Sequence, residues 1–309
     1  MEERSFISCD QKSNIHVAIW KPDVNLYPTP LAIVQIAHGM VEYIERYEDF
    51  AKFLTSNGIL VVGNDHLGHG KSATNDDELG YFRHENPENA LVLDMHHLTN
   101  IIKAKYPNAP YFLLGHSMGS FMARKYISIY GDELDGVIIS GTGNQSPALV
   151  SAGLFLTNIV GLIKGERYRS KFLANLMMSG YNKKIANPKT ASDWITRDEQ
   201  IVDAYVKNKY CTFLFTVNAY KGMFRTIQYI SKDKNINKIP SDLPTLMISG
   251  DMDPVGGYGK DVKKLYQKYS KHINDLTFKL YENDRHEVLN ELNKDEVYND
   301  ILDWIKSRI

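Results

Sequence analysis

The sequence predicts an α/β fold: a mostly parallel central sheet with helices on both faces, interrupted by a helical insertion. First, short apolar runs bounded by turn residues alternate with helical periodicity up to Gly143 and again after residue 242. Second, these apolar runs are continuous, which is typical of parallel strands that are buried on both faces. Third, the segment from about Ser146 to Asn237 has the pattern of successive helices and lacks the alternation of apolar and polar residues that marks a strand.

The individual elements follow from these patterns. Strands are expected over 31–37, 59–63, 111–114 and 137–140, and after the insertion over 243–249 and 276–281. Helices are expected over 43–56, 87–104 and 117–130, and at the end of the chain over 296–309. Gly58 follows the first of these helices in the position of a C-cap, and Gly131 ends the third.

These boundaries divide the chain into three segments. We expect residues 1–145 to form the first part of an α/β core and residues 238–309 to complete it. Residues 146–237 are expected to form a helical cap, or lid, inserted into that core.

The composition is that of a globular protein. Of the 309 residues, 43% are hydrophobic and 24% are charged, which excludes disordered, collagen-like and coiled-coil proteins as the overall class. Lys and Arg number 36 against 37 Asp and Glu, so the chain lacks the basic excess of a dedicated nucleic-acid-binding protein. We therefore expect a small-molecule partner and no nucleic acid.

The N-terminus and the cysteines predict a location. Residues 2–4 are charged and precede no apolar run, so we expect no signal peptide. Two cysteines, Cys9 and Cys211, cannot form a disulfide framework and suit a reducing compartment. The most apolar stretch, 149–163, is expected to be too short and too polar to cross a membrane. Together these observations predict a cytoplasmic protein.

One motif indicates nucleophilic catalysis. The segment Gly115-His116-Ser117-Met118-Gly119 fits the pattern G-x-S-x-G and lies between an expected strand and an expected helix. A sharp turn there lifts the serine Oγ out of the sheet, and glycines are needed because the backbone is crowded. The alternative is an ordinary turn with a capping serine. Ser117 is the predicted nucleophile.

A serine nucleophile needs a general base, and the base needs an orienting carboxylate. Asp251 and Asp253 both follow the strand expected at 243–249, and Asp251 could instead hydrogen-bond the turn. His286 lies in the loop after the last expected strand, where an imidazole can reach Ser117. His272 is the rival base, but it ends a charged helical stretch and suits a helix C-terminus.

Acyl transfer also needs two N–H groups directed at the developing oxyanion. One usually comes from the residue after the nucleophile, here Met118. The second is expected from the loop after an early strand, where His38-Gly39-Met40 follows the strand at 31–37. Met40 is therefore the second candidate, through its backbone, and the alternative is a plain glycine turn.

With these residues, the chain resembles the monoacylglycerol lipase and lysophospholipase branch of the α/β-hydrolases, which is grouped with the S33 serine aminopeptidases. The segments that carry the resemblance are, in chain order, HGMVEYIERY, DHLGHGKS, GHSMGS, SGDMDPVG and NDRHEVLNE. The resemblance implies an α/β-hydrolase fold with a cap over 146–237. It places the catalytic triad on Ser117, Asp253 and His286, and the oxyanion amides on Met40 and Met118.

Two further residues come from the resemblance. Glu42 and Arg46 match charged positions near the polar end of the pocket in monoacylglycerol lipases, which implies a substrate-binding role. Their i,i+4 spacing equally allows an ion pair on one helix face, and this alternative stays open.

A metal site is not expected. Asp65, His66 and His69 are close in sequence, but their loop is rich in glycine and lacks the helical spacing of a pair such as H-E-x-x-H. The adjacent His96 and His97 point different ways on an expected helix. The resemblance identifies the first group as part of a structural loop, and we expect neither a metal nor another cofactor.

The insertion mixes apolar and basic side chains. Its apolar residues include Leu149, Leu154, Phe155, Ile159, Leu162, Phe172, Leu176, Met177 and Met178. Its basic residues include Lys164, Arg167, Arg169, Lys171, Lys183 and Lys184. One hypothesis is the roof of an acyl tunnel whose basic rim makes transient contact with a membrane or micelle. The other is a helical cap with a solvated charged face.

We therefore predict a serine carboxylester hydrolase that cleaves a lipid-like ester, a monoacylglycerol or lysophospholipid, through an acyl-enzyme on Ser117. An aminopeptidase with the same triad would need an acidic cluster in the cap, and the candidates are Glu166, Asp193, Asp198 and Glu199. An acyltransferase stays open, because water and alcohols compete for the same acyl-enzyme. A ligand-binding module with a vestigial triad is disfavoured, because a binder has no need for all three triad residues.

Overall fold

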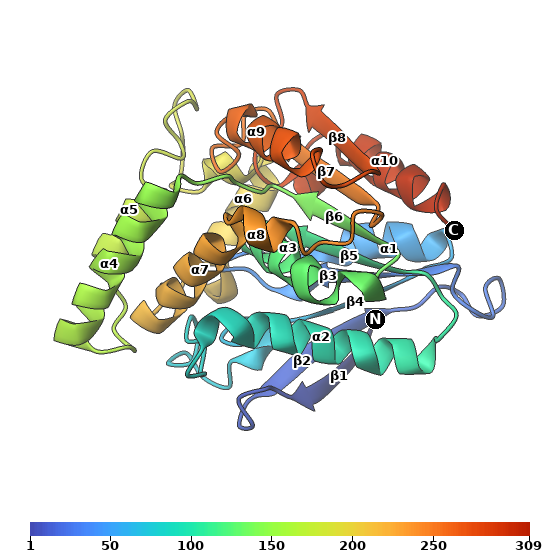
Figure 1. Ribbon diagram of the computed structural model, residues 1–309, viewed down its shortest axis with the longest axis horizontal. Coiled ribbons are helices and arrows are strands. Elements are labelled where there is room, and N and C mark those ends of the chain that lie inside the picture. The colour runs from blue at the N-terminus through green and yellow to red at the C-terminus, as the bar shows by residue number, and fades with distance from the viewer.

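A single eight-stranded sheet runs through the computed structural model, which describes residues 1–309 (Figure 1). The strands are β1 (Glu2–Ile7), β2 (Asn14–Trp20), β3 (Ala32–Ala37), β4 (Ile59–Asn64), β5 (Tyr111–His116), β6 (Gly136–Ser140), β7 (Thr245–Gly250) and β8 (Leu276–Tyr281). Their order in the sheet is β1-β2-β4-β3-β5-β6-β7-β8. The six strands β3 to β8 are parallel to one another. β2 pairs antiparallel with β1 on one side and with β4 on the other. The predicted fold class is confirmed.

All six expected strands are present, and their ends differ from the predicted ones by at most two residues. The sequence did not predict β1 or β2. β1 lies at the edge of the sheet and leaves most of its side chains exposed, so it lacks the continuous apolar run that marks the other strands. In β2, His16 interrupts the apolar pattern, although it is buried.

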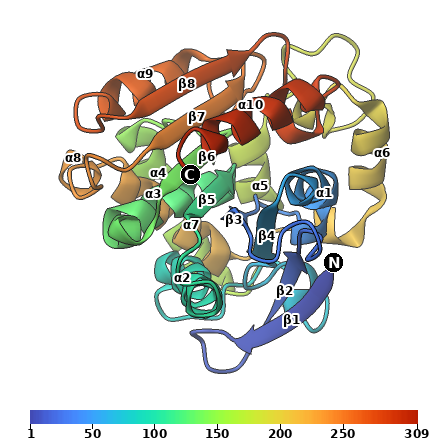
Figure 2. The ribbon, with the colours of Figure 1, turned by 90° about the vertical axis from the view of Figure 1, so that its right-hand side faces the viewer.

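Helices cover both faces of the sheet. Those that flank it are α1 (Glu48–Ser56), α2 (Pro87–Lys105), α3 (Met118–Tyr130), α9 (Lys260–Tyr269) and α10 (Lys294–Lys306). α1 and α10 lie on one face, and α2, α3 and α9 lie on the other (Figure 2). Each face has its own apolar layer: Phe50 and Tyr298 pack on the first, with ring centroids 5.0 Å apart, and Met95 and Met122 lie in the second.

Two helix starts differ from expectation in informative ways. The helix expected over 43–56 begins as a short 3₁₀ turn, η1 (Ile44–Tyr47), before α1. The helix expected from 117 begins at Met118, because Ser117 has a φ of 53° and is outside the helical region.

The segment between β6 and β7 is helical. It contains α4 (Pro147–Lys164), α5 (Lys171–Met178), α6 (Glu199–Lys207), α7 (Val217–Ile230) and α8 (Asp233–Ile236). α7 packs against α2 and α3, and its Tyr220 and Ile227 belong to the apolar layer of that sheet face. α4 packs on α7, and α4 and α5 together form one end of the molecule (Figure 1). The insertion therefore shares its core with the sheet, and the predicted cap boundaries stay predictions.

The helix α4 is more apolar and longer than the sequence suggested. It has 18 residues, is long and apolar enough to cross a membrane by length and composition only, and is 22% buried within the molecule. Its buried stripe consists of Val150, Gly153 and Thr157, which recur at helical spacing. The helix includes residues on both sides of 149–163, and the expectation that this segment does not cross a membrane stays a prediction.

Candidate active site

Loops from the carboxyl ends of five parallel strands meet around one cavity. The loops after β3, β5, β6, β7 and β8 contribute Gly39, Ser117, Asn144, Pro254 and His286 to its wall. The cavity has a volume of about 1180 Å³, and 27 of its 45 lining residues are hydrophobic. A largely apolar ligand therefore suits it. This edge of the sheet is where open α/β folds bind their ligands.

Ser117 occupies a sharp turn between β5 and α3. Its φ of 53° and ψ of −118° are uncommon for a residue with a side chain. A Cβ at Gly119 would lie 2.0 Å from the carbonyl oxygen of Ala37, and one at Gly115 would lie 2.5 Å from that of Gly119. Both positions therefore require glycine. The Ser117 side chain accepts no hydrogen bond from the helix, so it is not a capping serine, and it lies at the cavity wall.

The structure brings Asp253, and not Asp251, against His286. Oδ1 of Asp253 lies 3.0 Å from Nδ1 of His286, and both side chains are buried. The backbone N–H of Val255 donates to the same carboxylate oxygen at 2.8 Å, which helps to hold Asp253 in place. Asp251 instead accepts a hydrogen bond from the backbone of Asn283.

The rival base His272 lies elsewhere. Its Nε2 is 2.6 Å from the carbonyl oxygen of Ile239, just after the C-terminus of α9. It does not line the cavity. His286 does, and its Nε2 makes no hydrogen bond within the protein.

The surroundings of His286 favour the protonated imidazole. Burial alone lowers the pKa of His286, but the Asp253 carboxylate raises it, and so do Glu287 and Glu42, so the net pKa lies above its ordinary value. The ring of His116 lies 4.7 Å from that of His286, and the ring of Trp194 lies 4.9 Å from it. Burial lowers the pKa of His116 to about 3, so this neighbour is neutral at pH 7.

Two backbone N–H groups beside Ser117 have no acceptor. Met118 is the first residue of α3, where an N–H has no partner within the helix, and Met40 lies in the loop after β3. Both residues line the cavity. A Cβ at Gly39 would lie 3.0 Å from Cβ of Ser117, so the Met40 loop passes directly beside the serine. The structure thus places both predicted amides at the cavity wall next to Ser117.

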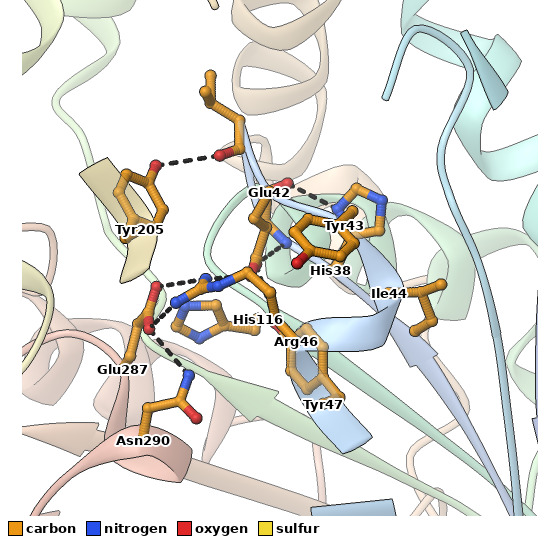
Figure 3. A network of polar contacts seen from close by, with 12 residues as sticks. His38, Glu42, Tyr43, Ile44, Arg46, Tyr47, His116, Tyr205, Glu287 and Asn290 are labelled. Atoms are coloured by element: carbon orange, nitrogen blue, oxygen red, sulfur yellow. Dashed lines mark hydrogen bonds and ion pairs between the residues drawn. The ribbon is translucent and has the colours of Figure 1, made fainter. Parts of the chain in front are cut away.

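Glu42 and Arg46 form a buried ion pair. Arg46 also pairs with Glu287, a residue that the sequence analysis did not single out. Nη1 of Arg46 donates to Glu42 at 2.6 Å, and both Nη atoms donate to Glu287, at 2.8 and 2.6 Å (Figure 3). Glu42 and Glu287 line the cavity, whereas Arg46 does not. Glu287 directly follows His286 in the motif NDRHEVLNE, and an acidic residue at that place is the signal that could have identified it.

The insertion contributes side chains that no local motif marks. Trp194 packs on His286, and Tyr205 of α6 packs under the guanidinium of Arg46, 4.9 Å from its carbon. The backbone N–H groups of His286 and Glu287 donate to carbonyls of residues 194 and 195, at 3.3 and 2.6 Å. The insertion is therefore joined directly to the loop that carries His286.

The histidines of the loops after β3 and β4 pack together. His38, His66 and His69 are buried, and the rings of His38 and His66 are 4.1 Å apart. Nε2 of His38 accepts a hydrogen bond from the backbone N–H of His66 at 3.0 Å. This ring nitrogen therefore helps to hold the loop in place. Asp65 accepts backbone N–H groups from Ile44 and Lys71, as expected of a structural loop.

One other group has metal-like spacing. Ligand atoms of Glu3, His16 and Glu45 lie within 4.8 Å of one another. However, Nζ of Lys71 donates to Glu3 and, at 2.6 Å, to Glu45. An ion pair thus already satisfies both carboxylates, and this group does not argue for a metal.

The sheet order and the Ser, His and Asp side chains at its carboxyl edge define an α/β-hydrolase. A sequence model of the family described as serine aminopeptidase, S33, matches residues 28–293, so the chain belongs to that family. The predicted resemblance is confirmed.

The most similar proteins include lipases and an esterase. The chain is 26% identical over 299 residues to a monoacylglycerol lipase of Mycolicibacterium smegmatis, with 94% of this chain and 92% of that protein covered. It is 28% identical over 303 residues to a monoglyceride lipase homolog of monkeypox virus, with 96% and 95% covered. A highly thermostable carboxyl esterase from Bacillus coagulans, solved in complex with glycerol, has a TM-score of 0.92 and 29% identity, with 99% and 98% covered. The protein is a hydrolase of the esterase or lipase type.

Replacing Gly39 by alanine is expected to impair catalysis more than folding. The new Cβ would lie 2.7 Å from Oε1 of Glu42 and 3.0 Å from Cβ of Ser117, so the Met40 amide would move. Loss of one oxyanion donor typically lowers kcat about 10²- to 10³-fold. Ester hydrolysis and the melting temperature of Gly39→Ala should be measured together. Turnover near that of the wild type would mean that this loop does not hold the oxyanion.

The buried histidines predict destabilisation by acid. Burial lowers the pKa of His66 to about 4 and those of His69 and His116 to about 3, whereas an unfolded histidine titrates near 6.5. Below pH 6.5 the unfolded chain therefore binds protons that the folded protein does not, and stability falls as the pH falls toward 4. Above pH 6.5 these groups contribute no pH dependence. Each contributes up to about 1.4 kcal/mol per pH unit.

The measurement is urea unfolding between pH 5 and 7, with His69→Phe as the variant. His69 packs against Phe82, Phe213 and Phe215, so a phenylalanine suits the site. Below pH 6.5, the free energy of unfolding should fall less steeply with decreasing pH in the variant. The difference in slope should correspond to one fewer proton taken up on unfolding, up to about 1.4 kcal/mol per pH unit. An unchanged slope would contradict the assignment of His69 as neutral in the folded state.

Proposed function

We propose that the protein hydrolyses esters of long-chain fatty acids, monoacylglycerols or lysophospholipids, through an acyl-enzyme on Ser117. The observation that carries this proposal is that Ser117 and His286 stand on the wall of a large, mostly apolar cavity. The acyl chain would occupy the apolar part and bring its ester carbonyl beside Ser117. Similarity to a monoacylglycerol lipase and to a carboxyl esterase supports the same reaction class.

Acylation uses the triad and the two free amides. Asp253 holds Nδ1 of His286, so that Nε2 is left to take the proton of the Ser117 hydroxyl. Oγ attacks the carbonyl carbon, and the negative charge that develops on the carbonyl oxygen is stabilised by the N–H groups of Met40 and Met118. The raised pKa of His286 favours this proton transfer.

Deacylation repeats the chemistry with water. The tetrahedral intermediate collapses, and the protonated His286 gives its proton to the leaving alcohol. A water molecule then gives a proton to Nε2 and attacks the acyl carbonyl. The fatty acid leaves, and the free Ser117 hydroxyl is restored.

The acidic residues of the insertion support an ester rather than a peptide substrate. A peptidase of this kind would need a free carboxylate in the cavity to hold a substrate ammonium. The four candidates are engaged elsewhere: Glu166 pairs with Lys221, Asp193 binds the backbone of 189 and 190, Asp198 caps α6, and Glu199 pairs with Lys189. None of them lines the cavity.

The test is hydrolysis of p-nitrophenyl esters from acetate to palmitate, with Ser117→Ala as the control. We expect activity that peaks at medium or long chains and falls by several orders of magnitude in the variant, which should keep its fold. A peak at acetate would move the substrate away from lipids. Activity in Ser117→Ala equal to the wild type would remove Ser117 from the mechanism.

Two further assays separate the alternatives. Faster cleavage of amino-acid arylamides than of esters would favour an aminopeptidase. Transfer of the acyl group to added glycerol, in place of release as free acid, would favour an acyltransferase.

We also propose that the insertion makes transient contact with a membrane or micelle. α4 and α5 expose a set of large apolar side chains: Leu149, Phe155, Ile159, Leu162, Ile163, Phe172, Leu176 and Met178. Lys164 and Lys171 are exposed beside them, and a cationic rim favours an anionic lipid surface. A lipid ester could pass from such a surface to the cavity, since α4 and α5 also supply part of its wall.

Leu162→Glu tests this contact, with Leu26→Glu as the matched control. The two side chains are 87% and 72% exposed, but Leu26 lies in the loop between β2 and β3. We expect Leu162→Glu to sediment less with vesicles that contain anionic phosphatidylglycerol and Leu26→Glu to behave like the wild type. Hydrolysis of soluble p-nitrophenyl butyrate should be unchanged in both variants. Equal sedimentation of all three proteins would contradict the proposal.

A further inference from the structure

The loop that carries Met40 does not hold its shape by regular hydrogen bonding. It follows β3 and precedes η1, and Val41 within it has a φ of 56°. A positive φ is rare for a β-branched side chain, so the surrounding contacts must impose it. The direction of the Met40 N–H depends on those contacts. The Met118 N–H does not, because α3 sets it.

Contacts within the loop and from two neighbouring elements, η1 and α6, hold this loop. Glu42 accepts hydrogen bonds from the backbone N–H of Gly39 and, at 2.9 Å, from the hydroxyl of Tyr47 in η1. The hydroxyl of Tyr205 in α6 donates to the carbonyl oxygen of Val41 at 3.0 Å. The Gly39 N–H belongs to the peptide unit before that of the Met40 N–H, and the Val41 carbonyl belongs to the second unit after it, so these bonds hold the loop on both sides of Met40.

Arg46 joins Glu42 to the loop of the catalytic base. Its guanidinium donates to Glu42 through Nη1 and to both oxygens of Glu287, in the bidentate geometry that gives the strongest pairs (Figure 3). Tyr205 covers the guanidinium. All three charged side chains are at least nine-tenths buried.

Glu287 is itself held in place. It is the residue after His286, its carboxylate accepts a hydrogen bond from Asn290 at 2.9 Å, and its backbone N–H donates to Ile195 at 2.6 Å. A shift of the Glu287 side chain would therefore move the backbone of the adjacent His286. The three charged side chains thus connect the Gly39 amide, next to Met40, to Glu287, next to the base His286.

We propose that Arg46, Glu42 and Glu287 form a positioning network. This network fixes the position and direction of the Met40 N–H relative to His286. This inference rests on the proposed function of Ser117 and His286. None of the three residues acts on the substrate. Their effect is to keep the oxyanion amide and the base in one fixed geometry while charge develops between them.

The charges explain why all three residues are needed. Burial raises the pKa of Glu42 and would raise that of Glu287, but the guanidinium of Arg46 lowers the pKa of Glu287 below its ordinary value. Without Arg46, two carboxylates would face each other in a buried site, and one or both would move or take up a proton. The Gly39 amide and the His286 loop would then lose their common anchor.

A substrate-binding role for Arg46 fits the structure less well. Both of its Nη atoms are used by Glu42 and Glu287, an aromatic ring covers its plane, and it does not line the cavity. Glu42 lines the cavity but is bound to Gly39, Arg46 and Tyr47.

The experiment compares Arg46→Met and Glu287→Gln with Arg308→Met. Arg308 makes a bidentate pair with Asp275 through Nε and Nη2. This pair is more exposed than that of Arg46 and lies outside the cavity wall, so its variant controls for loss of an ion pair. Three quantities are measured: kcat and KM for p-nitrophenyl butyrate, the same for a monoacylglycerol, and inhibition by an alkyl boronic acid. The boronic acid forms a tetrahedral adduct with a nucleophilic serine and so probes the oxyanion position.

We expect Arg46→Met to lower kcat about 10- to 100-fold for both substrates, with KM changed by less than about threefold. The inhibition constant of the boronic acid should rise by the same factor as kcat falls. Glu287→Gln should show a smaller loss of the same kind, because it keeps the size of the side chain and one acceptor. Arg308→Met should match the wild type in all three quantities.

Other outcomes would overturn the inference. A higher KM for the monoacylglycerol alone, with kcat intact, would make Arg46 a substrate contact. A loss of kcat with unchanged boronic acid inhibition would mean that the oxyanion position is not affected. If Arg46→Met does not fold, wild-type kcat and inhibition in Glu287→Gln overturn it. Absence of Ser117-dependent hydrolysis in the wild type would instead overturn the proposed function itself.

Discussion

The close approach of the N-terminus of α3 to the end of β3 is the constraint on which the site depends. Gly119 packs so tightly on the carbonyl of Ala37 that no side chain fits between them. This contact forces Ser117 into its unusual backbone conformation, and it brings the loop after β3 against the serine. The nucleophile, the free amide at the first residue of α3 and a second free amide from the neighbouring loop then converge.

Burial of polar groups is the second constraint, because each must find a partner inside the protein. Asp253 is fixed by the turn after β7, and it fixes His286. Arg46 has two carboxylates and an aromatic face. The same low-polarity surroundings that make these contacts strong keep the nearby His116 neutral. The site is therefore held by local contacts around Glu42 together with long-range pairs such as that of Arg46 with Glu287.

The insertion contributes both to the hydrophobic core and to the wall of the cavity. α7 contributes to the core on the α2 and α3 face, whereas α4 and α5 expose large apolar side chains, some of which, such as Leu149 and Leu176, also line the cavity. Residues 194–197 are bonded to the loop that carries His286 through backbone and side-chain contacts, among them the pair of Arg197 with Asp284. Motion of the insertion that reached these residues would therefore move the base.

The sequence by itself determined the fold class, six parallel strands and the serine turn, because each has a local signature: an apolar run, or glycines at the two places where a side chain does not fit. It also identified the loops that follow the late strands. It could not choose between Asp251 and Asp253 from position alone, since two residues on one turn point in different directions that only the packed turn defines. It missed β1, which is an exposed edge, and it gave no sign of Trp194 or Tyr205. The joining of Glu42, Arg46 and Glu287 was likewise decided by tertiary structure, because Arg46 and Glu287 are 241 residues apart and meet only when the sheet brings the ends of β3 and β8 to the same edge.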